Sequence, residues 1–279
     1  MDHKLLLVQR SDMIVERLAA GQSLLSLGIR TSRTPDIVRM AATCGYDVVW
    51  IDLEHSTMSL ETACLLAQTA RDIGLAAWVR PPEQDYGAIG RLLDGGASGI
   101  IATHIATADD ARKAVASCRY PPRGERSQNA LLPQLAFERM PAAKRVEVVD
   151  RQTVLQVLIE SEEGVRNAEA IAAVDGVDLI ALGLNDLSSQ LGCIGQPRHP
   201  EIMSACRHVA KAVRRQGKQL VVGGVTDPEH FNELVELGVA PLAFAAIDTE
   251  LLIEALDGRA AKWRAGQTSP NTHDRTSQS

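Results

Sequence analysis

The feature that most constrains the fold is a repeated alternation of short apolar segments with helical patterns. Several apolar segments, such as VVWI at 48–51 and VLQVLI at 154–159, are near-continuous, as parallel strands covered on both faces require. Strict alternation over 279 residues favours a closed (β/α)8 barrel over an open doubly wound sheet. No G-x-G-x-x-G motif follows the first strand, which weakens a dinucleotide-binding alternative. We therefore predict a TIM barrel with strands at 23–27, 48–52, 76–80, 99–103, 154–159, 178–183, 220–225 and 240–247.

Helix start and stop signals indicate one domain. Thr34 followed by Pro35 predicts a helix start, while Ser59 and Gly74 bound a second helix. Further helices are expected at 8–20, 85–94, 107–119, 138–149, 162–173, from 200, 228–237 and 249–263. The proline-rich segment 120–137 is longer than an ordinary connection and is typical of a functional loop. Residues 1–263 are expected to form the barrel, and the polar residues 264–279 a disordered tail.

The composition excludes several classes of protein. The chain has 45% hydrophobic residues, 23% charged residues and a net charge of −6, with no basic excess to suggest nucleic acid. No apolar run approaches the roughly 18 residues of a membrane helix, and no signal-peptide cleavage pattern follows the N-terminus. Five scattered cysteines without a C-x-x-C pair predict free thiols in a reducing compartment. We expect a cytoplasmic protein that binds neither nucleic acid nor membrane.

Polar residues follow five of the predicted strands. In a (β/α)8 barrel the catalytic groups lie at the C-terminal ends of the strands, so these residues are expected to converge on one rim. A solvated loop whose acids face water is the alternative for the residues that follow strand 48–52. The rim residues predicted in this way are Asp52, Glu54, His55, Arg80, Thr103, His104, Glu160, Asn185 and Asp186.

Two of these carboxylates indicate a metal site. Glu160 and Asp186 follow neighbouring strands, and paired carboxylates with water suit a hard divalent cation such as Mg²⁺ or Mn²⁺. Zinc is disfavoured because no cluster of His or Cys accompanies them. Helix N-capping is the alternative for each residue taken singly.

The arginine and the histidines also have two interpretations. Arg80 precedes Pro81 and Pro82 at a strand end, where its guanidinium suits a substrate carboxylate; a structural ion pair with a rim acid is the alternative. Asp52 would orient the ring of His55 for general-base catalysis. For His104 we expect a histidine in the core whose ring nitrogens have hydrogen-bond partners.

Seven motifs, in order over about residues 20–255, resemble the HpcH/HpaI aldolase/citrate lyase family. They are IDLEHS, WVRPP, LLDGGASGI, TADDARKAV, RYPPRGER, IESEEGVRNAEAIAAVDGVDLIALG and NDLSSQLG. The resemblance implies a barrel of the phosphoenolpyruvate/pyruvate-domain type that assembles as a homohexamer. It also implies a divalent metal (Mg²⁺ or Mn²⁺, with Co²⁺ as a further candidate) that binds pyruvate for reversible aldol cleavage.

The resemblance also implies roles for individual residues. Glu160 and Asp186 match the family's metal ligands, Arg80 matches the arginine that contacts the keto acid, and His55 with Asp52 matches the base dyad. Glu54 lies within the same catalytic motif. The other residues implied are Asp94, which reaches a neighbouring subunit's site, Arg123 and Arg126 in the loop near the entrance, and Gly183, Asn185 and Leu158 beside the substrate.

Four positions depart from the family pattern. Leu158 replaces the usual glutamine that helps hold pyruvate, and Leu184 replaces a proline before the Asp-Leu-Ser motif. Ser127 stands where glycine is usual and Thr103 where proline is frequent. The implied metal ligands and base are intact, whereas the groups that shape the bound acid are altered.

The sequence predicts a metal-dependent carbon–carbon lyase that cleaves a 4-hydroxy-2-oxo acid into a 2-oxo acid and an aldehyde. No lysine ends a predicted strand, which disfavours a Schiff-base aldolase. A condensing enzyme of the citrate-forming type, acting on acetyl-CoA and oxaloacetate, is one alternative. A non-catalytic barrel that binds a keto acid is the alternative from another class.

Overall fold

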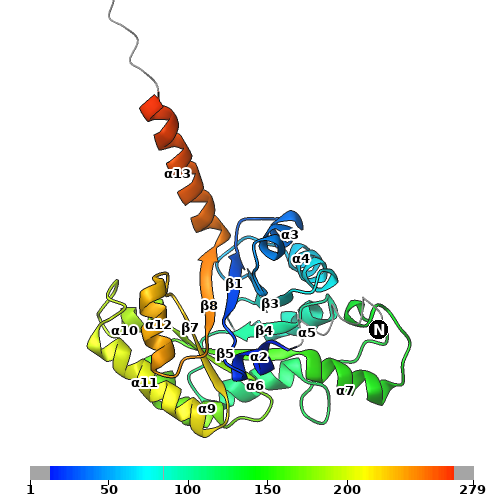
Figure 1. Ribbon diagram of the computed structural model, residues 1–279. Coiled ribbons are helices and arrows are strands. Elements are labelled where there is room, and N and C mark those ends of the chain that lie inside the picture. Colours follow the sequence, from blue (N-terminus) through cyan, green and yellow to red (C-terminus); the bar gives the residue numbers. More distant parts are fainter. Residues whose placement is uncertain (1–12, 84, 267–279) are drawn as a thin grey trace, which may run out of the picture.

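The computed structural model describes residues 13–83 and 85–266 of the chain. Eight parallel strands form one sheet in the order β7-β6-β5-β4-β3-β2-β1-β8. Helices follow the strands, and all of them except the last, α13 (Asp248–Gly266), lie along the outside of the barrel (Figure 1). The strands are β1 Leu24–Ile29, β2 Val48–Asp52, β3 Ala76–Arg80, β4 Gly99–Ala102, β5 Val154–Ile159, β6 Leu179–Gly183, β7 Gln219–Gly223 and β8 Leu242–Ile247.

The sheet curls into a nearly closed barrel. Within the described residues β7 and β8 contact each other, although no hydrogen-bonded ladder joins them. The predicted (β/α)8 fold is therefore confirmed. The helices are α2 Ile14–Ala19, α3 Asp36–Thr43, α4 Leu60–Asp72, α5 Tyr86–Asp94, α6 Ala108–Cys118, α7 Ala142–Gln152, α8 Glu162–Arg166, α9 Ala168–Ala172, α10 Leu184–Gln190, α11 Pro200–Arg215, α12 Pro228–Glu236 and α13 Asp248–Gly266, with a 3₁₀ turn at Pro133–Leu135.

Two helix predictions need correction. The helix expected at 162–173 is split into α8 and α9 at Asn167, whose side-chain amide donates to the Ala106 carbonyl at 2.8 Å. Residues 264–266, which were expected to belong to the tail, lie in α13, which continues to Gly266. The rest of the predicted tail, 267–279, lies outside the described residues, as does the start of the helix predicted at 8–20.

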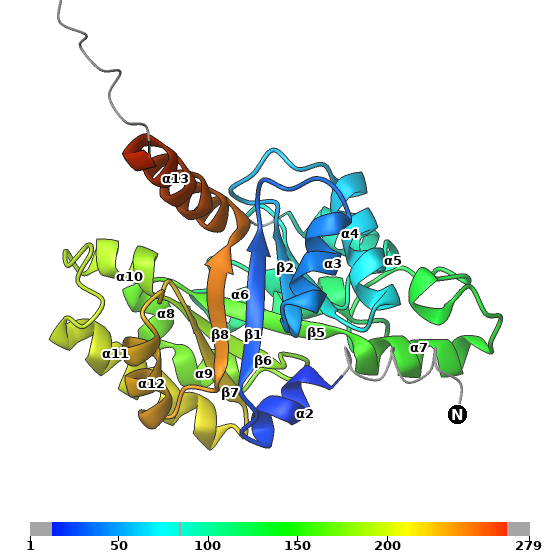
Figure 2. The same cartoon turned by 45° about the horizontal axis from the view of Figure 1, so that its top comes forward.

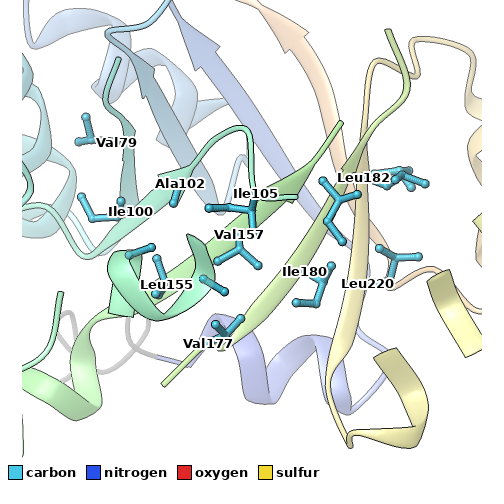
Figure 3. Close-up of a cluster of buried hydrophobic side chains, with 14 of the residues drawn as sticks. Val79, Ile100, Ala102, Ile105, Leu155, Val157, Val177, Ile180, Leu182 and Leu220 are labelled. Carbon is cyan, nitrogen blue, oxygen red and sulfur yellow. The ribbon is translucent and has the colours of Figure 1, made fainter. Parts of the chain in front are cut away.

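The core consists of two apolar layers and a small third cluster formed by Tyr120, Leu132, Leu135 and Val149. The larger layer lies between the strands and the helices, where Ile100, Val157 and Leu182 are among the buried side chains (Figure 3). Burying a side chain of this size contributes about 1.5–3 kcal/mol. The smaller layer fills the inside of the barrel, and Ile14 and Leu18 of α2 join it.

Two tryptophans inside the barrel require glycines opposite them. A Cβ atom on Gly28 would lie 2.6 Å from the ring of Trp50, and one on Gly99 would lie 2.5 Å from the ring of Trp78. Both distances are shorter than van der Waals contact, so only glycine fits at these positions. Both tryptophans belong to the apolar layer inside the barrel, and Trp50 also lines the cavity at the C-terminal ends of the strands.

The last helix does not pack on the barrel. Almost every residue of α13 is exposed, and the helix projects away from the other helices (Figures 1 and 2). The outer face of β8 and β1 has exposed positions as well, among them Ala245 and Leu25, which is 41% exposed. Among the described residues, no helix is both long and apolar enough to cross a membrane.

Candidate active site

A cavity of about 300 Å³ opens at the C-terminal ends of the strands, where the sequence predicts the functional groups. Side chains that lie earlier along the strands, such as Trp50 and Leu158, form its apolar floor. The polar and charged residues that line it are Arg30, Arg80, Gln156, Glu160, Asn185, Asp186, Thr226 and Glu250.

Asp52 is the fully buried centre of an ion-pair network beside this cavity. Its Oδ2 accepts from Arg80 Nη2 at 2.6 Å and from Arg30 Nε at 2.6 Å, and its Oδ1 accepts from Arg80 Nε at 3.0 Å. Burial by itself raises the pKa of Asp52, but the hydrogen bonds and charge of Arg80, followed by the bond from Arg30, hold that pKa below its usual range. The carboxylate is therefore ionised and fixed.

Arg80 is engaged by carboxylates at each of its three guanidinium nitrogens. Besides its two bonds to Asp52, its Nη1 lies 3.1 Å from Oε2 of Glu54. The side chain is only 10% exposed, and its Cζ lies 5.1 Å from the ring centroid of Trp50. This geometry is the structural ion pair that the sequence left as an alternative, although Arg80 also lines the cavity.

Arg30 is a second guanidinium in the cavity, and the sequence predictions omitted it. It follows β1, and the buried Asp248 carboxylate fixes its backbone by accepting from the N–H groups of Arg30, Thr31 and Ser32. The signal that could have identified it is the alternation of β1. Continuing the predicted first strand by two or three residues places Arg30 at a strand end, as for the other rim residues.

His55 does not form the predicted pair with Asp52. Within the described residues, no ion-pair contact joins the His55 ring to the Asp52 carboxylate, which instead accepts from the His55 backbone N–H at 3.2 Å. The reason is that the two arginines already occupy the carboxylate. The ring of His55 is 57% exposed, and its Nε2 lies 3.7 Å from Oε2 of Glu54.

His104 lies at the rim, so the prediction of a core histidine is wrong. Its Nε2 lies 3.1 Å from Oε1 of Glu54, and its backbone N–H donates to Oε2 of Glu160 at 3.2 Å. It has a positive φ of 56°, which is strained for a residue with a side chain. This backbone conformation directs both its N–H and its ring toward the carboxylates, and the sequence alone gives no sign of it.

Glu160 is a buried carboxylate that pairs with no Lys or Arg in the described part of the chain; Nδ1 of His104 lies 3.8 Å from its Oε2. It directly follows β5, is 6% exposed, and has its pKa raised to about 7. Burial is the main cause; the His104 N–H lowers the pKa, and the negative charges of Asp186 and Glu54 raise it further. A Cβ on Gly183 would lie 2.8 Å from the side chain of Glu160, so the glycine leaves room for the carboxylate.

Neither Glu160 nor Asp186 caps a helix, which removes the alternative that the sequence left open. Ser161 caps α8 by accepting from the Gly164 N–H at 3.0 Å. The N-cap of α10 is Gly183, and Asp186 lies within the first turn of that helix. Both carboxylates line the cavity.

The two carboxylates could hold a divalent cation. Oxygen ligands of this type suit Mg²⁺ or Mn²⁺, and a cation between them would remove the electrostatic cost that raises the pKa of Glu160. No group of three or more His, Cys, Asp or Glu arranged for a metal occurs in the part of the chain that the structure describes. The remaining ligands would therefore be substrate and water.

The residues predicted beside the substrate line the same cavity. Leu158 contributes an apolar wall and is 7% exposed, Gly183 is the last residue of β6, and Asn185 lies in the first turn of α10. Gln156, two residues before Leu158 and on the same face of β5, is 2% exposed, and its Oε1 has no hydrogen-bond partner among the described residues. This strand thus carries a glutamine deeper in the barrel than residue 158, the position where the resemblance implies one.

Arg123 and Arg126 do not line this chain's cavity, and their expected role at the entrance or at a neighbouring subunit's site stays a prediction. They follow α6, and a helix that follows a strand returns the chain to the opposite end of the barrel. Arg126 Nη2 lies 2.7 Å from Oδ1 of Asp94 at the end of α5, and Arg123 lies 3.9 Å from Asp175. A contribution of Asp94 to a neighbouring subunit's site remains a prediction.

Comparison with known proteins places this geometry in a family. Residues 30–255 match the HpcH/HpaI aldolase/citrate lyase family. The 4-hydroxy-4-methyl-2-oxoglutarate aldolase tasA of Hapsidospora irregularis is 37% identical over 81% of this chain and 85% of its own length.

Two solved structures have folds similar to that of this chain. The HpcH/HpaI aldolase of Desulfitobacterium hafniense superposes with a TM-score of 0.83 at 29% identity, covering 92% of this chain and 98% of that one. The citrate synthase SbnG superposes with a TM-score of 0.79 at 27% identity, covering 90% and 97%. The chain therefore belongs to the HpcH/HpaI aldolase/citrate lyase family and is an enzyme of the aldolase and lyase type.

Proposed function

We propose that this enzyme is a divalent-metal-dependent aldolase that cleaves a 4-hydroxy-2-oxo acid into pyruvate, or a related 2-oxo acid, and a carbonyl compound. The observation that carries the proposal is the pair Glu160 and Asp186 in the cavity, where the pKa of Glu160 is raised to about 7. The relative from Hapsidospora irregularis, named for an aldolase of a 4-hydroxy-2-oxo diacid, supports the same reaction class.

Glu160 and Asp186 would hold the cation, with Mg²⁺ and Mn²⁺ as the first candidates and Co²⁺ as a third. When bound, the cation supplies Lewis-acid charge for the oxygens of the 2-oxo acid. In this proposal the carboxylate of the acid also contacts groups of the protein. The first N–H groups of α10 have no intrahelical acceptor, and they lie beside Gly183 and Asn185, where a carboxylate can accept from them.

Cleavage requires a base for the 4-hydroxyl proton. As that proton leaves, the C3–C4 bond breaks, a carbonyl forms at C4, and the electron pair remains with the 2-oxo acid as its enolate. His55 is the proposed base, and His104 is the second candidate, because both rings pair with the Glu54 carboxylate. The network of Asp52, Arg80 and Glu54 fixes the backbone that carries His55.

Two other functions give different products. A condensing enzyme, the activity for which SbnG is named, would join acetyl-CoA to oxaloacetate, and a keto-acid-binding barrel would catalyse neither reaction. The test is to incubate the Mg²⁺-loaded protein with pyruvate and a panel of aldehydes, and separately with acetyl-CoA and oxaloacetate. We expect new carbon–carbon bonds in the first mixture only; products in the second mixture alone, or in neither, would overturn the proposal.

Leu158→Gln is expected to strengthen pyruvate binding. Leu158 lines the cavity with an apolar side chain, and a glutamine there would add a hydrogen bond to the bound acid. Hydrogen bonds to charged groups contribute about 1.5–3 kcal/mol, so the dissociation constant should fall about ten- to a hundredfold. Titration calorimetry with pyruvate and MgCl₂ measures the effect, with Leu158→Met as the size-matched control. Equal affinities in wild type and Leu158→Gln would place residue 158 away from the acid.

We also propose that copies of this enzyme associate with one another. The resemblance to the family implies a hexamer. Helix α13 carries five exposed large apolar side chains, Leu251, Leu252, Ile253, Leu256 and Trp263. The outer face of β8 and β1 has exposed apolar positions in the same chain, including Leu25. The occupant we propose for this face is α13 of a second copy, because the two apolar surfaces then cover each other reciprocally.

Free thiols at all five cysteines support the predicted cytoplasmic location.

Glutamates on α13 are expected to dissociate the assembly. Leu252 and Leu256 lie one turn apart on the exposed helix, and burial of each contributes about 1.5–3 kcal/mol. The double change Leu252→Glu and Leu256→Glu should convert the oligomer to smaller species in sedimentation velocity, while Arg259→Glu on the same helix should not. A wild type that sediments as a monomer, or an unchanged mass in the double variant, would contradict this role of α13.

A further inference from the structure

Arg30 and Arg80 face the same cavity, but they differ in their free hydrogen-bonding capacity. Each of the three nitrogens of Arg80 is already paired with Asp52 or Glu54. Arg30 uses Nε for Asp52 at 2.6 Å, whereas its two terminal nitrogens have no protein acceptor within the described residues. Those nitrogens carry four N–H groups. Arg30 therefore has donors left for a ligand.

Arg30 is also held in place before any ligand binds. Asp248, 1% exposed, accepts from the backbone N–H of Arg30 at 2.9 Å and from two further N–H groups of the same loop. The guanidinium is fixed by Asp52 on one side, and its Cζ lies 5.9 Å from the ring centroid of Trp50. A guanidinium fixed in this way loses little side-chain entropy when it binds a carboxylate in a two-pronged geometry.

The distribution of charged groups in the cavity determines which part of the substrate can contact Arg30. Glu160 and Asp186 belong to the half of the cavity where the 2-oxo acid binds in the proposed function. A carboxylate elsewhere on the substrate needs a cation of its own, because desolvating it unpaired is costly. Glu250 also lines the cavity, and its carboxylate accepts from the Ile247 N–H at 3.3 Å.

We infer that Arg30 is the specificity-determining residue that binds a second carboxylate, carried on the half of the substrate that leaves as the carbonyl compound. The preferred substrates are then 4-hydroxy-2-oxo dicarboxylic acids, in preference to acids with an uncharged end. This inference rests on the proposed function for the orientation of the substrate, and on the unpaired donors of Arg30 for the recognition itself.

The test compares two acids that differ only at the far end. These are 2-oxoglutarate and 2-oxopentanoate, in which a methyl group replaces the second carboxylate. Titration calorimetry in MgCl₂ with wild type, Arg30→Met and Arg30→Lys measures binding without requiring turnover. Arg39→Met is the matched control, because Arg39 is an exposed arginine on α3 that pairs with Asp36. Asp52 keeps its two bonds from Arg80 in each variant, which favours correct folding.

Wild type and Arg39→Met should bind 2-oxoglutarate more tightly than 2-oxopentanoate. Arg30→Met should weaken 2-oxoglutarate binding about ten- to a hundredfold, as expected for loss of a charge-assisted bond, and leave 2-oxopentanoate unchanged. The affinity of Arg30→Lys for 2-oxoglutarate should lie between those of wild type and Arg30→Met. An equal loss for both acids, or a wild type without preference, would overturn the inference.

Turnover separates this inference from the proposed function. Wild type should release pyruvate faster from 4-hydroxy-2-oxoglutarate than from 4-hydroxy-2-oxopentanoate, and Arg30→Met should remove that difference. A binding preference that depends on Arg30 without release of pyruvate from either compound would reject the aldolase and keep the role of Arg30. Turnover of both compounds at equal rates by wild type would reject the role of Arg30 and keep the aldolase.

Discussion

Glu160→Gln is expected to lower kcat/KM by about a thousandfold while making the metal-free protein more stable at pH 8. Loss of about 4 kcal/mol of transition-state stabilisation, the scale of Lewis-acid assistance, corresponds to that fall in rate. The glutamine keeps the volume of the side chain and an oxygen for the His104 N–H, so the fold should be retained. Steady-state release of pyruvate measures the first effect.

The stability effect follows from the raised pKa of Glu160. Between its ordinary 4.5 and about 7, the folded protein binds more protons than the unfolded chain, so the free energy of unfolding falls as the pH rises through that window. Above the window the charged group costs about 3 kcal/mol, which glutamine removes.

Thermal unfolding in EDTA at pH 5 and pH 8 measures the stability effect. Glu162→Gln, at the exposed first residue of α8, is the control and should follow wild type. A Glu160→Gln protein that is no more stable than wild type at pH 8 would show that Glu160 is not an unbalanced buried charge.

Arg80→Met is expected to destabilise the protein by about 3–5 kcal/mol, the cost of removing one partner from a buried ion pair. Asp52 is fully buried and would keep only Arg30 and two backbone N–H groups as partners. Arg80→Lys should keep more of the fold but lose most activity, because a lysine lacks the fork that joins Asp52 to Glu54.

The double variant Asp52→Asn and Arg80→Met separates charge from packing. An uncharged Asn needs no guanidinium, so this variant should recover part of the stability lost in Arg80→Met, though not its activity. Urea unfolding gives the free energies for the cycle, with Arg39→Met as the surface control. Additive losses at the two positions would mean that the Arg80–Asp52 pair contributes little.

Much of the barrel was predictable because its strands are buried on both faces. Segments such as 48–52 and 76–80 contain continuous apolar runs with helix signals on either side, and both match the observed strands β2 and β3. The first strand was predicted at 23–27, whereas β1 continues through Gly28 to Ile29, next to Arg30. Gly28 leaves room for the ring of Trp50, a contact made only in the folded barrel.

The pairing of the site residues was less predictable than their location. Asp52 and Arg80 face each other because β2 and β3 align in that register, and register depends on the whole sheet. Closeness in sequence favoured an Asp52–His55 pair instead, which the arginines exclude. The left-handed backbone of His104 and the projection of α13 are also tertiary features, because the same sequences are compatible with other conformations.

Exchange of the pyruvate methyl protons in D₂O tests the central claim most directly, because it reports formation of the enolate of the 2-oxo acid, for which the carboxylate pair and its cation are needed, and it requires no aldehyde. Proton NMR should show the methyl signal of pyruvate disappearing with wild type and MgCl₂, and persisting with EDTA, with Glu160→Gln or with Asp186→Asn. Exchange at the wild-type rate in EDTA or in either variant would contradict the assignment of Glu160 and Asp186 as the groups that make this barrel an aldolase.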